Sequence, residues 1–275
     1  MNTKITILID NQAEAGLASE HGFSLCIQTA DRYVLFDTGQ GNLFANNARA
    51  LGVDLGKTDT LVLSHGHFDH TGGIPQLLHQ AEKTHVYCHP SVVHPRYSIR
   101  NGTRVAIQMP VASMAAMDKL SFEQLHWLQQ PCSLSETIGL TGPIPRRTSY
   151  EDTGGPFYLD PQGKRPDPID DDLALWIRTD NGLVVCVGCS HAGLINTLNH
   201  VRELNNGLKI HTIIGGFHLL NADHARLEQT IEALRLLNPD RIVPCHCTGA
   251  SAVDRLRDAL GKQVFPGAAG MTFHF

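Results

Sequence analysis

The chain has 275 residues, of which 42% are hydrophobic and 18% charged, and its formal net charge is −5. This composition is typical of a globular protein with a substantial core, and the lack of a basic run argues against a nucleic-acid partner. No stretch approaches the roughly eighteen apolar residues of a membrane span. Seven cysteines, an odd number, do not indicate a disulfide framework. With no signal peptide in the first residues, we expect a soluble, cytoplasmic protein.

The first ninety residues alternate apolar runs with turn residues. Strands are predicted where β-branched and apolar residues run together, over residues 4–9, 23–29, 33–36, 60–64 and 86–88. Helices are predicted over residues 43–51 and 73–81. The third strand ends in a polar turn, Asp37-Thr38-Gly39, at its carboxyl end.

Residues 90–170 differ in composition from the rest of the chain. Three methionines, Met109, Met114 and Met117, lie near alanine-rich sequence, and stretches rich in Gly, Pro and Thr follow. Long functional loops commonly cover a substrate. We therefore expect an inserted lid within a single domain spanning residues 1–275.

Regular patterns return after residue 170. Strands are predicted over residues 173–178, 183–187, 210–214 and 241–244, and helices over residues 195–204, 224–237 and 252–260. Asn181-Gly182 between the first two strands is a strong hairpin signal. Strands followed by helices in both halves predict an α/β fold.

The most informative stretch is residues 61–73, in which an apolar strand ends in Ser64-His65-Gly66-His67-Phe68-Asp69-His70. A strand end delivers side chains to the edge of a sheet, where open α/β folds place their sites. Neutral imidazole and carboxylate groups suit zinc, iron or manganese. The alternative is a polar loop that is rich in histidine by chance, since the chain has 16 histidines.

Residues 64–70 resemble the first metal motif of the metallo-β-lactamase-fold hydrolases. Further segments resemble the subgroup often labelled dihydropteroate-synthase-like, which includes proteins proposed to act in methanopterin biosynthesis; these segments are residues 9–11, 20–24, 36–39, 187–191, 215–218 and 244–249. The resemblance runs from about residue 5 to residue 250. It implies a four-layer αββα sandwich of two mixed sheets.

The resemblance also implies two sets of metal ligands. One metal would be held by His65, His67 and His191, and the other by Asp69, His70 and His246.

At one point the chain departs from the wider family. Asp170-Asp171-Asp172 stands where many members carry a histidine, and Cys189 stands near an expected aspartate. The bridging ligand is therefore left open between Cys189, which as a thiolate would favour zinc, and Asp171 or Asp172. A capped loop is an equally good explanation for the aspartates.

The cysteine spacing offers two other interpretations. Cys186-x-x-Cys189 with Cys245-x-Cys247 suggests a four-thiolate zinc site, and the first pair alone suggests a redox motif. Cys186 lies inside an apolar run, where cysteine commonly behaves as a small hydrophobic residue. Both interpretations are therefore disfavoured.

Several polar residues outside the motif are candidates for supporting roles. Asp37 is placed to accept a hydrogen bond from a ligand imidazole, and His218 to donate a proton to a leaving group or to bind substrate. Asn11, Glu20 and His21 are expected at the mouth of a pocket. Arginines of the insertion are candidates to bind an anionic substrate, although exposed arginines are usually only solvated; they are Arg96, Arg100, Arg104, Arg146 and Arg147.

These features predict a metal-dependent hydrolase that uses a metal-bound hydroxide on an ester or phosphoester-type small molecule, with Asp69 and His218 as catalytic residues. One or two divalent transition metals per chain are expected, zinc first and iron or manganese as alternatives. Two alternative functions remain: a pterin-related condensing enzyme, and a metal-binding metabolite sensor with little turnover. A diiron redox protein is disfavoured, since such proteins usually carry Glu at the position of His67 together with a flavin domain.

Overall fold

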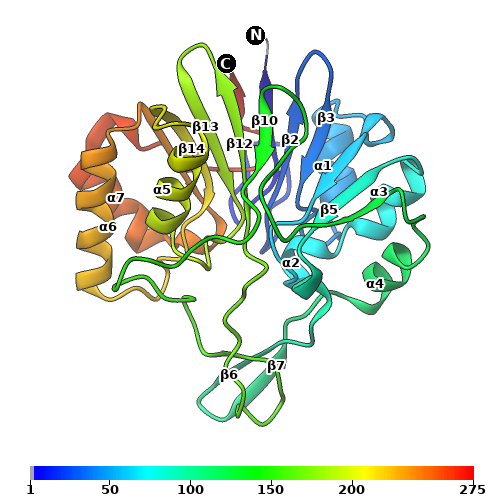
Figure 1. The fold of residues 1–275 in the computed structure, drawn as a ribbon, viewed down its shortest axis with the longest axis horizontal. Coiled ribbons are helices and arrows are strands. Elements are labelled where there is room, and N and C mark those ends of the chain that lie inside the picture. Colours follow the sequence, from blue (N-terminus) through cyan, green and yellow to red (C-terminus); the bar gives the residue numbers. More distant parts are fainter. Residues whose placement is uncertain (1–2) are drawn as a thin grey trace. The chain divides into compact units, whose positions relative to one another are not determined.

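The computed structural model describes residues 3–275 and divides them into two compact units. Unit 1 comprises the described residues up to Leu128, Pro156–Asp171 and Ala268–Phe275, and unit 2 comprises Gln129–Gly155 and Asp172–Gly267. Each unit is built on its own mixed β-sheet with helices against it (Figure 1).

Unit 1 contains a seven-stranded sheet in the order β16-β1-β2-β3-β4-β5-β8. Its strands are β1 (Lys4–Ile9), β2 (Ser24–Gln28), β3 (Tyr33–Phe36), β4 (Thr60–Val62), β5 (His85–Cys88), β8 (Leu125–Trp127) and β16 (Thr272–His274). The pairs from β16 to β3 are antiparallel, and those from β3 to β8 are parallel. The parallel pairing of β3 with β4 aligns Leu35 with Leu61 and brings the two carboxyl ends to one edge of the sheet.

The helices of unit 1 are α1 (Phe44–Ala50), α2 (Phe68–Thr71), α3 (Ile74–Gln80) and α4 (Val111–Met117), with 3₁₀ turns η1 (Leu55–Lys57) and η2 (Pro90–Val93). The three longer helices, α1, α3 and α4, bury apolar side chains in one core with strands of this sheet. Phe44 of α1, Leu77 of α3 and Met117 of α4 share one core with Leu35 and Leu61. Burying such large side chains is worth about 1.5–3 kcal/mol each.

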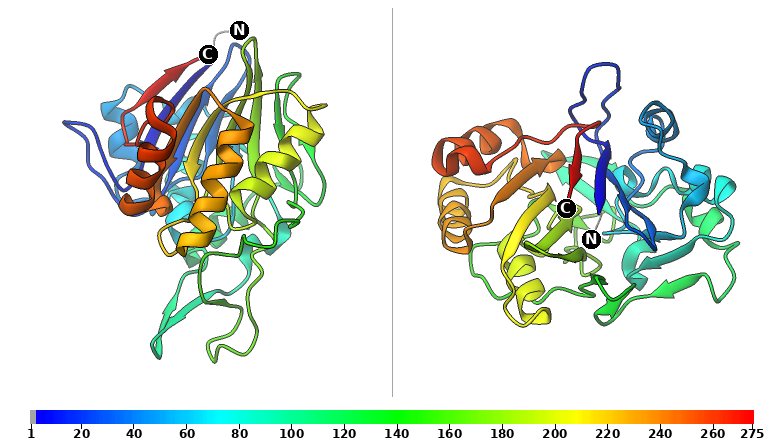
Figure 2. Two further views of the ribbon diagram at one scale, coloured as in Figure 1. Left: turned by 90° about the vertical axis from the view of Figure 1, so that its left-hand side faces the viewer. Right: turned by 90° about the horizontal axis from the view of Figure 1, so that it is seen from above.

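A second, three-stranded sheet of unit 1 has the order β11-β6-β7, with β6 (Tyr97–Arg100), β7 (Thr103–Ala106) and β11 (Phe157–Tyr158). The β6–β7 hairpin turns at Asn101 and Gly102, both with positive φ, as a tight hairpin turn requires. The hairpin extends as an arm from the rest of unit 1 (Figure 2).

Unit 2 contains a six-stranded sheet in the order β15-β14-β13-β12-β10-β9. Its strands are β9 (Cys132–Ser133), β10 (Ile138–Leu140), β12 (Ala174–Thr179), β13 (Gly182–Val187), β14 (Ile210–Gly216) and β15 (Arg241–Cys245). Strands β13, β14 and β15 are parallel to one another, and the remaining pairs are antiparallel. The carboxyl ends of three neighbouring strands therefore meet at one edge.

Three helices cover one face of the unit 2 sheet. They are α5 (Leu194–Leu204), α6 (His224–Leu237) and α7 (Ala250–Leu260), and two 3₁₀ turns, η3 (His246–Thr248) and η4 (Gly261–Gln263), complete the unit. The α6 helix begins at Asp223, whose side chain accepts a hydrogen bond from the Arg226 backbone N–H, and ends at Asn238 in the left-handed conformation. Leu198, Leu234 and Leu256 place α5, α6 and α7 in one core with the sheet.

The segment 90–170 is more deeply built into the protein than the sequence analysis expects. Strand β8 joins the sheet of unit 1, and β9 and β10 join that of unit 2. Met109 and Met117 are buried in the core of unit 1. Within residues 3–275, none of the helices combines the length and the apolar character needed to span a membrane.

Candidate metal centre

The candidate ligands of unit 1 lie near the adjacent carboxyl ends of β3 and β4. Asp37 follows β3, and its buried carboxylate accepts two hydrogen bonds from Ser64, which follows β4. The Ser64 backbone N–H donates to Oδ1 at 2.7 Å and the Ser64 hydroxyl to Oδ2 at 2.6 Å. These two bonds connect the ends of the two strands at the start of the histidine motif.

The same carboxylate determines which nitrogens of two histidines carry protons. His70 Nδ1 lies 2.7 Å from Asp37 Oδ2 and donates to it, because a carboxylate only accepts. Since the Ser64 hydroxyl uses its single proton on Asp37, its oxygen accepts from His65 Nδ1 at 2.9 Å. In the neutral form of these two fully buried imidazoles, Nε2 is therefore the nitrogen with the lone pair. The prediction that Asp37 accepts a hydrogen bond from a motif histidine is confirmed.

His65 and His67 face each other with two nitrogens that suit a common cation. His65 Nε2 and His67 Nδ1 lie 2.9 Å apart, and the two rings meet at 79°. Nitrogens that share a tetrahedral zinc ion at 2.0–2.1 Å lie about 3.3 Å from each other. Burial lowers the pKa of His67 to about 3, so its imidazole is neutral, as a metal ligand must be. The donor set therefore fits a transition-metal ion.

The short α2 helix that carries Asp69 and His70 is held by three side-chain hydroxyl groups that donate to backbone carbonyls in and next to the helix. Thr38 donates to the His70 carbonyl, Thr71 to the His67 carbonyl, and Ser113 to the Thr71 carbonyl, at 2.7–3.0 Å. These bonds reduce the freedom of the motif before any ligand binds.

Two residues expected at a pocket mouth have different roles. His21, which is largely exposed, places Nε2 3.0 Å from Asp69 Oδ2 and lies within 3.4 Å of the Asn11 amide. Glu20 instead accepts hydrogen bonds from the backbone N–H groups of Gln40 and Leu43, and so supports the loop that precedes α1.

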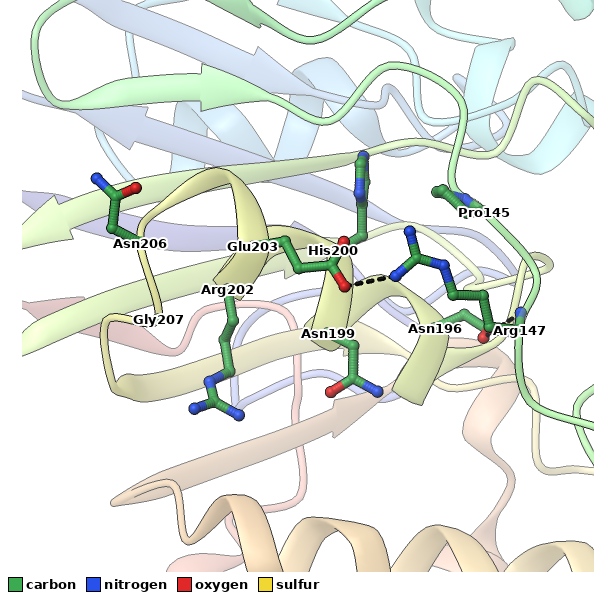
Figure 3. A pocket seen from close by; sticks show the side chains of 9 residues that line it. All are labelled: Pro145, Arg147, Asn196, Asn199, His200, Arg202, Glu203, Asn206 and Gly207. Atoms are coloured by element: carbon green, nitrogen blue, oxygen red, sulfur yellow. Dashed lines mark hydrogen bonds and ion pairs between the residues drawn. The ribbon is translucent and has the colours of Figure 1, made fainter.

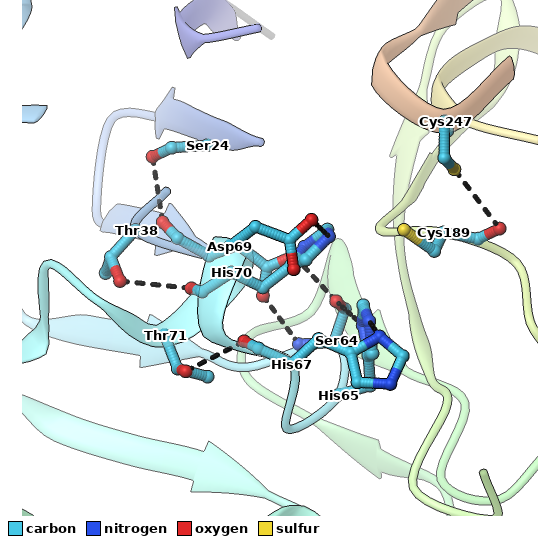
Figure 4. A network of polar contacts seen from close by, with 12 residues as sticks. Ser24, Thr38, Ser64, His65, His67, Asp69, His70, Thr71, Cys189 and Cys247 are labelled. Carbon is cyan, nitrogen blue, oxygen red and sulfur yellow. Dashed lines mark hydrogen bonds and ion pairs between the residues drawn. The ribbon is translucent and has the colours of Figure 1, made fainter. Parts of the chain in front are cut away.

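In unit 2 the three parallel strands each end in a candidate residue. Cys189 and His191 follow β13, His218 follows β14, and His246 follows β15, and all four side chains are at most 9% exposed. The strand ends are linked, because the Gly216 N–H donates to the Gly188 carbonyl and the Ser190 hydroxyl to the Gly216 carbonyl. Cys247 Sγ lies 3.8 Å from the Cys189 carbonyl oxygen (Figure 4).

His191 is oriented by a backbone acceptor that sequence reasoning missed. Its Nδ1 lies 2.7 Å from the Thr153 carbonyl oxygen, which only accepts, so Nδ1 carries the proton and Nε2 the lone pair. The same loop packs on His218: a Cβ added to Gly154, at φ 84°, would lie 1.9 Å from His218 Nδ1. The His191 and His218 rings are 4.5 Å apart. A carbonyl acceptor leaves no side-chain signature, so only the structure reveals it.

Several residues at or next to these positions have a strained backbone conformation. Among the described non-glycine residues with positive φ are Asp37, Ser190, His218 and His246, with φ between 47° and 62°. Residues held in this region cost roughly 1–3 kcal/mol each and cluster at functional sites. Each of them immediately follows a strand or belongs to the loop after one.

The two aspartates proposed as bridging ligands are engaged elsewhere. Asp171 accepts hydrogen bonds from the Gly66 N–H and from Arg96, and Asp172 accepts one from the Ala192 N–H. Burial raises the pKa of the Asp171 carboxyl, but the adjacent Arg96 guanidinium outweighs this effect and the net pKa is lowered. Both carboxylate oxygens of Asp171 thus accept hydrogen bonds from the chain itself.

The insertion arginines are mostly committed to internal contacts. Arg96 is fully buried against two aspartates, Arg146 donates to the His191 carbonyl, and Arg147 pairs with Glu203. A four-thiolate zinc site is also not formed, because none of the candidate metal-binding groups among residues 3–275 contains more than one cysteine. Cys186 is fully buried in β13, and burial raises the pKa of its thiol.

Unit 2 also has a cavity of about 550 Å³ beside α5 (Figure 3). Its lining includes the Arg147–Glu203 ion pair together with Asn199 and His200. None of the predicted ligands lines it, so its size alone does not mark it as the reactive site.

The model of the metallo-β-lactamase superfamily matches residues 20–246. The chain belongs to the metallo-β-lactamase superfamily. The predicted fold is thereby confirmed as a metallo-β-lactamase fold of helices and several mixed sheets.

Two relatives and one solved structure extend this result. The chain is 29% identical to the 7,8-dihydropterin-6-methyl-4-(β-D-ribofuranosyl)-aminobenzene-5′-phosphate synthase of Methanocaldococcus jannaschii, over 91% of this chain and 89% of that one. It is also 29% identical to an uncharacterized protein of the same archaeon, covering 92% and 93% of the two chains. The crystal structure of Tm1679, a metal-dependent hydrolase of the β-lactamase superfamily, matches with a TM-score of 0.83 and 30% identity over 98% of both chains. The predicted resemblance to the methanopterin-related subgroup is confirmed.

Within this family, most of the predicted ligands belong to candidate metal-binding groups. These are His65, Asp69 and His70 of unit 1 and Cys189, His191 and His246 of unit 2. The family and these His/Cys/Asp groups together indicate metal dependence.

Proposed function

We propose that this protein is a metal-dependent hydrolase acting on an ester or phosphoester bond of a small, anionic molecule. The observation that carries the proposal is the preset tautomer of three buried imidazoles. His65, His70 and His191 each commit Nδ1–H to a protein acceptor and keep the lone pair on Nε2. Metal-binding histidines are oriented in this way.

The proposed ligands are the histidines and the aspartate of the first motif with the side chains that follow the strands of unit 2: His65, His67, Asp69, His70, His191 and His246, with Cys189 as an additional candidate. Imidazole and carboxylate donors with one thiol suit zinc best, with iron or manganese as alternatives. A bound divalent ion would supply a Lewis acid that lowers the pKa of water and polarises a carbonyl or phosphoryl oxygen.

The remaining chemistry falls to the chain's own side chains. Hydrolysis requires a proton on the departing oxygen, and His218 is the proposed group to hold it. The His218 ring is confined between Gly154 and His191, which limits the orientations open to its nitrogens. Asp69, whose carboxylate contacts His21, is the proposed partner for a proton on the attacking water.

A second candidate function is synthesis. The 29% identity to the dihydropterin-linked synthase extends over 91% of this chain, which favours a condensation between a dihydropterin donor and an aromatic amine. Condensation and hydrolysis are distinguished by whether two substrates are joined or one is cleaved.

The metal site is tested by elemental analysis of purified protein. We expect one to two transition-metal ions per chain, lost in the double variant His65→Ala/His67→Ala. The matched control is His85→Ala/His126→Ala. It removes a second pair of unit 1 histidines, on β5 and β8, in which His85 Nδ1 lies 3.0 Å from His126 Nε2. Unchanged metal content in the first variant, or equal loss in both, would contradict the site.

The reaction is tested by two assays on the metal-loaded protein. One is a panel of phosphodiesters, phosphomonoesters, carboxylic esters and lactones; the other mixes a dihydropterin donor with a ribofuranosylaminobenzene 5′-phosphate. Cleavage that is lost in His65→Ala/His67→Ala supports the hydrolase. Product formation only in the second assay would replace it with the synthase, and inactivity in both with bound metal would favour a sensor.

A further inference from the structure

The run Asp170-Asp171-Asp172 contains two buried carboxylates and one exposed one. Asp171 is 1% exposed and Asp172 2% exposed, whereas Asp170 faces solvent. A buried carboxylate is costly unless hydrogen bonds or a counter-charge compensate its lost hydration. The partners that compensate these two side chains therefore show what the segment does.

Asp171 is attached to the loop that carries His65 and His67. Its Oδ2 accepts a hydrogen bond at 2.8 Å from the backbone N–H of Gly66, the residue between those two histidines. The loop is closely packed at this point, since a Cβ on Gly66 would lie 2.0 Å from the Val92 carbonyl oxygen. A shift of the Asp171 carboxylate would therefore be transmitted to the peptide joining the two imidazoles.

Asp171 is in turn held in place by a buried cation. Arg96 donates through Nη1 and Nη2 to the two oxygens of Asp171, at 2.8 and 2.5 Å, and its Nε lies 2.9 Å from Asp167. A two-point contact between guanidinium and carboxylate fixes orientation as well as distance. Arg96 is 0% exposed, so water does not weaken the contact.

The chain between Asp167 and Asp171 adopts a strained conformation. Ile169 has φ 50°, which is unusual for a β-branched residue. Its N–H donates to Asp167 Oδ1 at 2.9 Å and its side chain is fully buried. The segment therefore has one specified shape, as expected where position matters.

Asp172 makes the corresponding contact in unit 2. Its Oδ2 accepts a hydrogen bond at 2.7 Å from the backbone N–H of Ala192, the residue directly after His191. Together with the Thr153 carbonyl on His191 Nδ1, this bond restrains both the backbone and the ring of that histidine.

From these contacts we infer that Asp171 and Asp172 are positioning residues, one for each metal-binding loop: Asp171, clamped by Arg96, places His65 and His67, and Asp172 places His191. This inference rests on the proposed metal-binding function. It assigns the aspartate run to orienting the ligand loops through their backbones and not to metal ligation. Loss of such supporting contacts typically weakens metal binding roughly ten- to hundredfold.

The role of Asp172 is tested with a pair of substitutions that differ in one acceptor. Asp172→Asn keeps an oxygen for the Ala192 N–H, and Asp172→Ala removes it. We expect the affinity for Co²⁺, measured by chelator competition, to fall roughly ten- to hundredfold in Asp172→Ala and to recover in Asp172→Asn. The visible absorption of bound Co²⁺ should shift in the alanine variant only, and the exposed neighbour supplies the control, Asp170→Ala, with no change.

Asp171 needs a different design, because removing it alone leaves the Arg96 charge buried and risks unfolding. The triple variant Arg96→Met/Asp167→Asn/Asp171→Leu removes the ion cluster as a unit. Its unreplaced losses are the acceptor for the Gly66 N–H and the Arg96 donor to the Ser91 carbonyl oxygen. We expect a folded protein with weaker Co²⁺ binding and an altered Co²⁺ spectrum.

The outcomes distinguish failure of the positioning role from failure of the proposed metal-binding function. Wild-type protein that binds no Co²⁺ would overturn the proposed function itself. Wild-type binding with Asp172→Ala and the triple variant both within twofold of it, in folded protein, would overturn the positioning role alone. Weakened binding in Asp172→Asn as large as in Asp172→Ala would show that the carboxylate charge acts directly, which overturns positioning in favour of ligation.

Discussion

Asp37→Asn is the sharpest single test of how the candidate ligands of unit 1 are organised. The carboxylate accepts three hydrogen bonds, from the Ser64 N–H, the Ser64 hydroxyl and His70 Nδ1, at 2.6–2.7 Å. An amide has one acceptor oxygen, and its NH₂ group would face the two donors at Oδ2. If the oxygen remains on the Ser64 N–H, the hydroxyl must rotate and His70 must move its proton from Nδ1 to Nε2.

Two magnitudes follow from this geometry. Hydrogen bonds to a charged group contribute about 1.5–3 kcal/mol each, so two lost bonds correspond to about 3–6 kcal/mol. The Ser64 hydroxyl can rotate and the His70 imidazole can move its proton, so both can form new hydrogen bonds to the amide. We therefore expect the loss of unfolding free energy to lie near the lower limit of this range. At this chain length that loss corresponds to a melting temperature about 6–12 °C lower. The second effect is on metal affinity, because a proton on His70 Nε2 blocks the nitrogen proposed as the donor; we expect a roughly ten- to hundredfold loss.

The assay compares the melting temperature of metal-free protein with Co²⁺ affinity from chelator competition. Asp59→Asn is the matched control. Asp59 also accepts hydrogen bonds, from the Tyr33 N–H and the Thr60 hydroxyl, but it precedes β4 and is 37% exposed. The Asp59→Asn substitution should lower the melting temperature only slightly and leave the Co²⁺ affinity unchanged. Wild-type Co²⁺ affinity in a destabilised Asp37→Asn protein would refute the tautomer argument.

Three further predictions concern unit 2 and the cysteines. Gly154→Ala should displace His218, because its Cβ would lie 1.9 Å from His218 Nδ1; steady-state kinetics should show a lower kcat with unchanged metal content, and unaltered kcat would contradict a proton-transfer role. Burial raises the pKa of Cys26 to about 12, so at pH 8 about 10⁻⁴ of it is thiolate and Ellman's reagent should modify it only after unfolding; rapid labelling of Cys26 in native protein would oppose this. If Cys189 is a metal ligand, Cys189→Asp should retain the metal, whereas Cys189→Ala should lose part of it. If Cys189 only packs in the core, Cys189→Ala should leave the metal content unchanged. Cys189→Asp should then lower the melting temperature, because it buries a charge.

The sequence was informative wherever chemistry and periodicity coincide. An apolar run followed by a dense histidine motif predicts both the strand β4 and the donors after it, and His224–Leu237 is recognisable by its helical spacing alone. Asp37 was also accessible, because a polar residue directly after a buried strand lies at the sheet edge.

Other parts had no comparable signal. Strands β8 and β16 have three residues each, too few for an alternating pattern to show. They are recognised as strands only by their pairing with β5 and β1 in the folded sheet. Met109 and Met117 lie in sequence that resembles a loop, yet tertiary packing places them in a core. The pairing of Arg96 with Asp171 spans 75 positions, and a single sequence cannot show which of its charges meet.

Strain connects the scaffold to the site. Asp37, Ser190, His218 and His246 all hold positive φ, and at roughly 1–3 kcal/mol each the total is about 4–12 kcal/mol, as large as the net stability of many proteins. Such a conformation persists only where the surroundings determine it more strongly than local preference does. Here each strained residue follows a buried strand in the parallel part of a sheet, where ladder hydrogen bonds and core packing constrain the chain up to the last residue of the strand. The parallel strands thus do more than bring donors to one edge: they stabilise backbone conformations that the donor-bearing loops would not adopt alone.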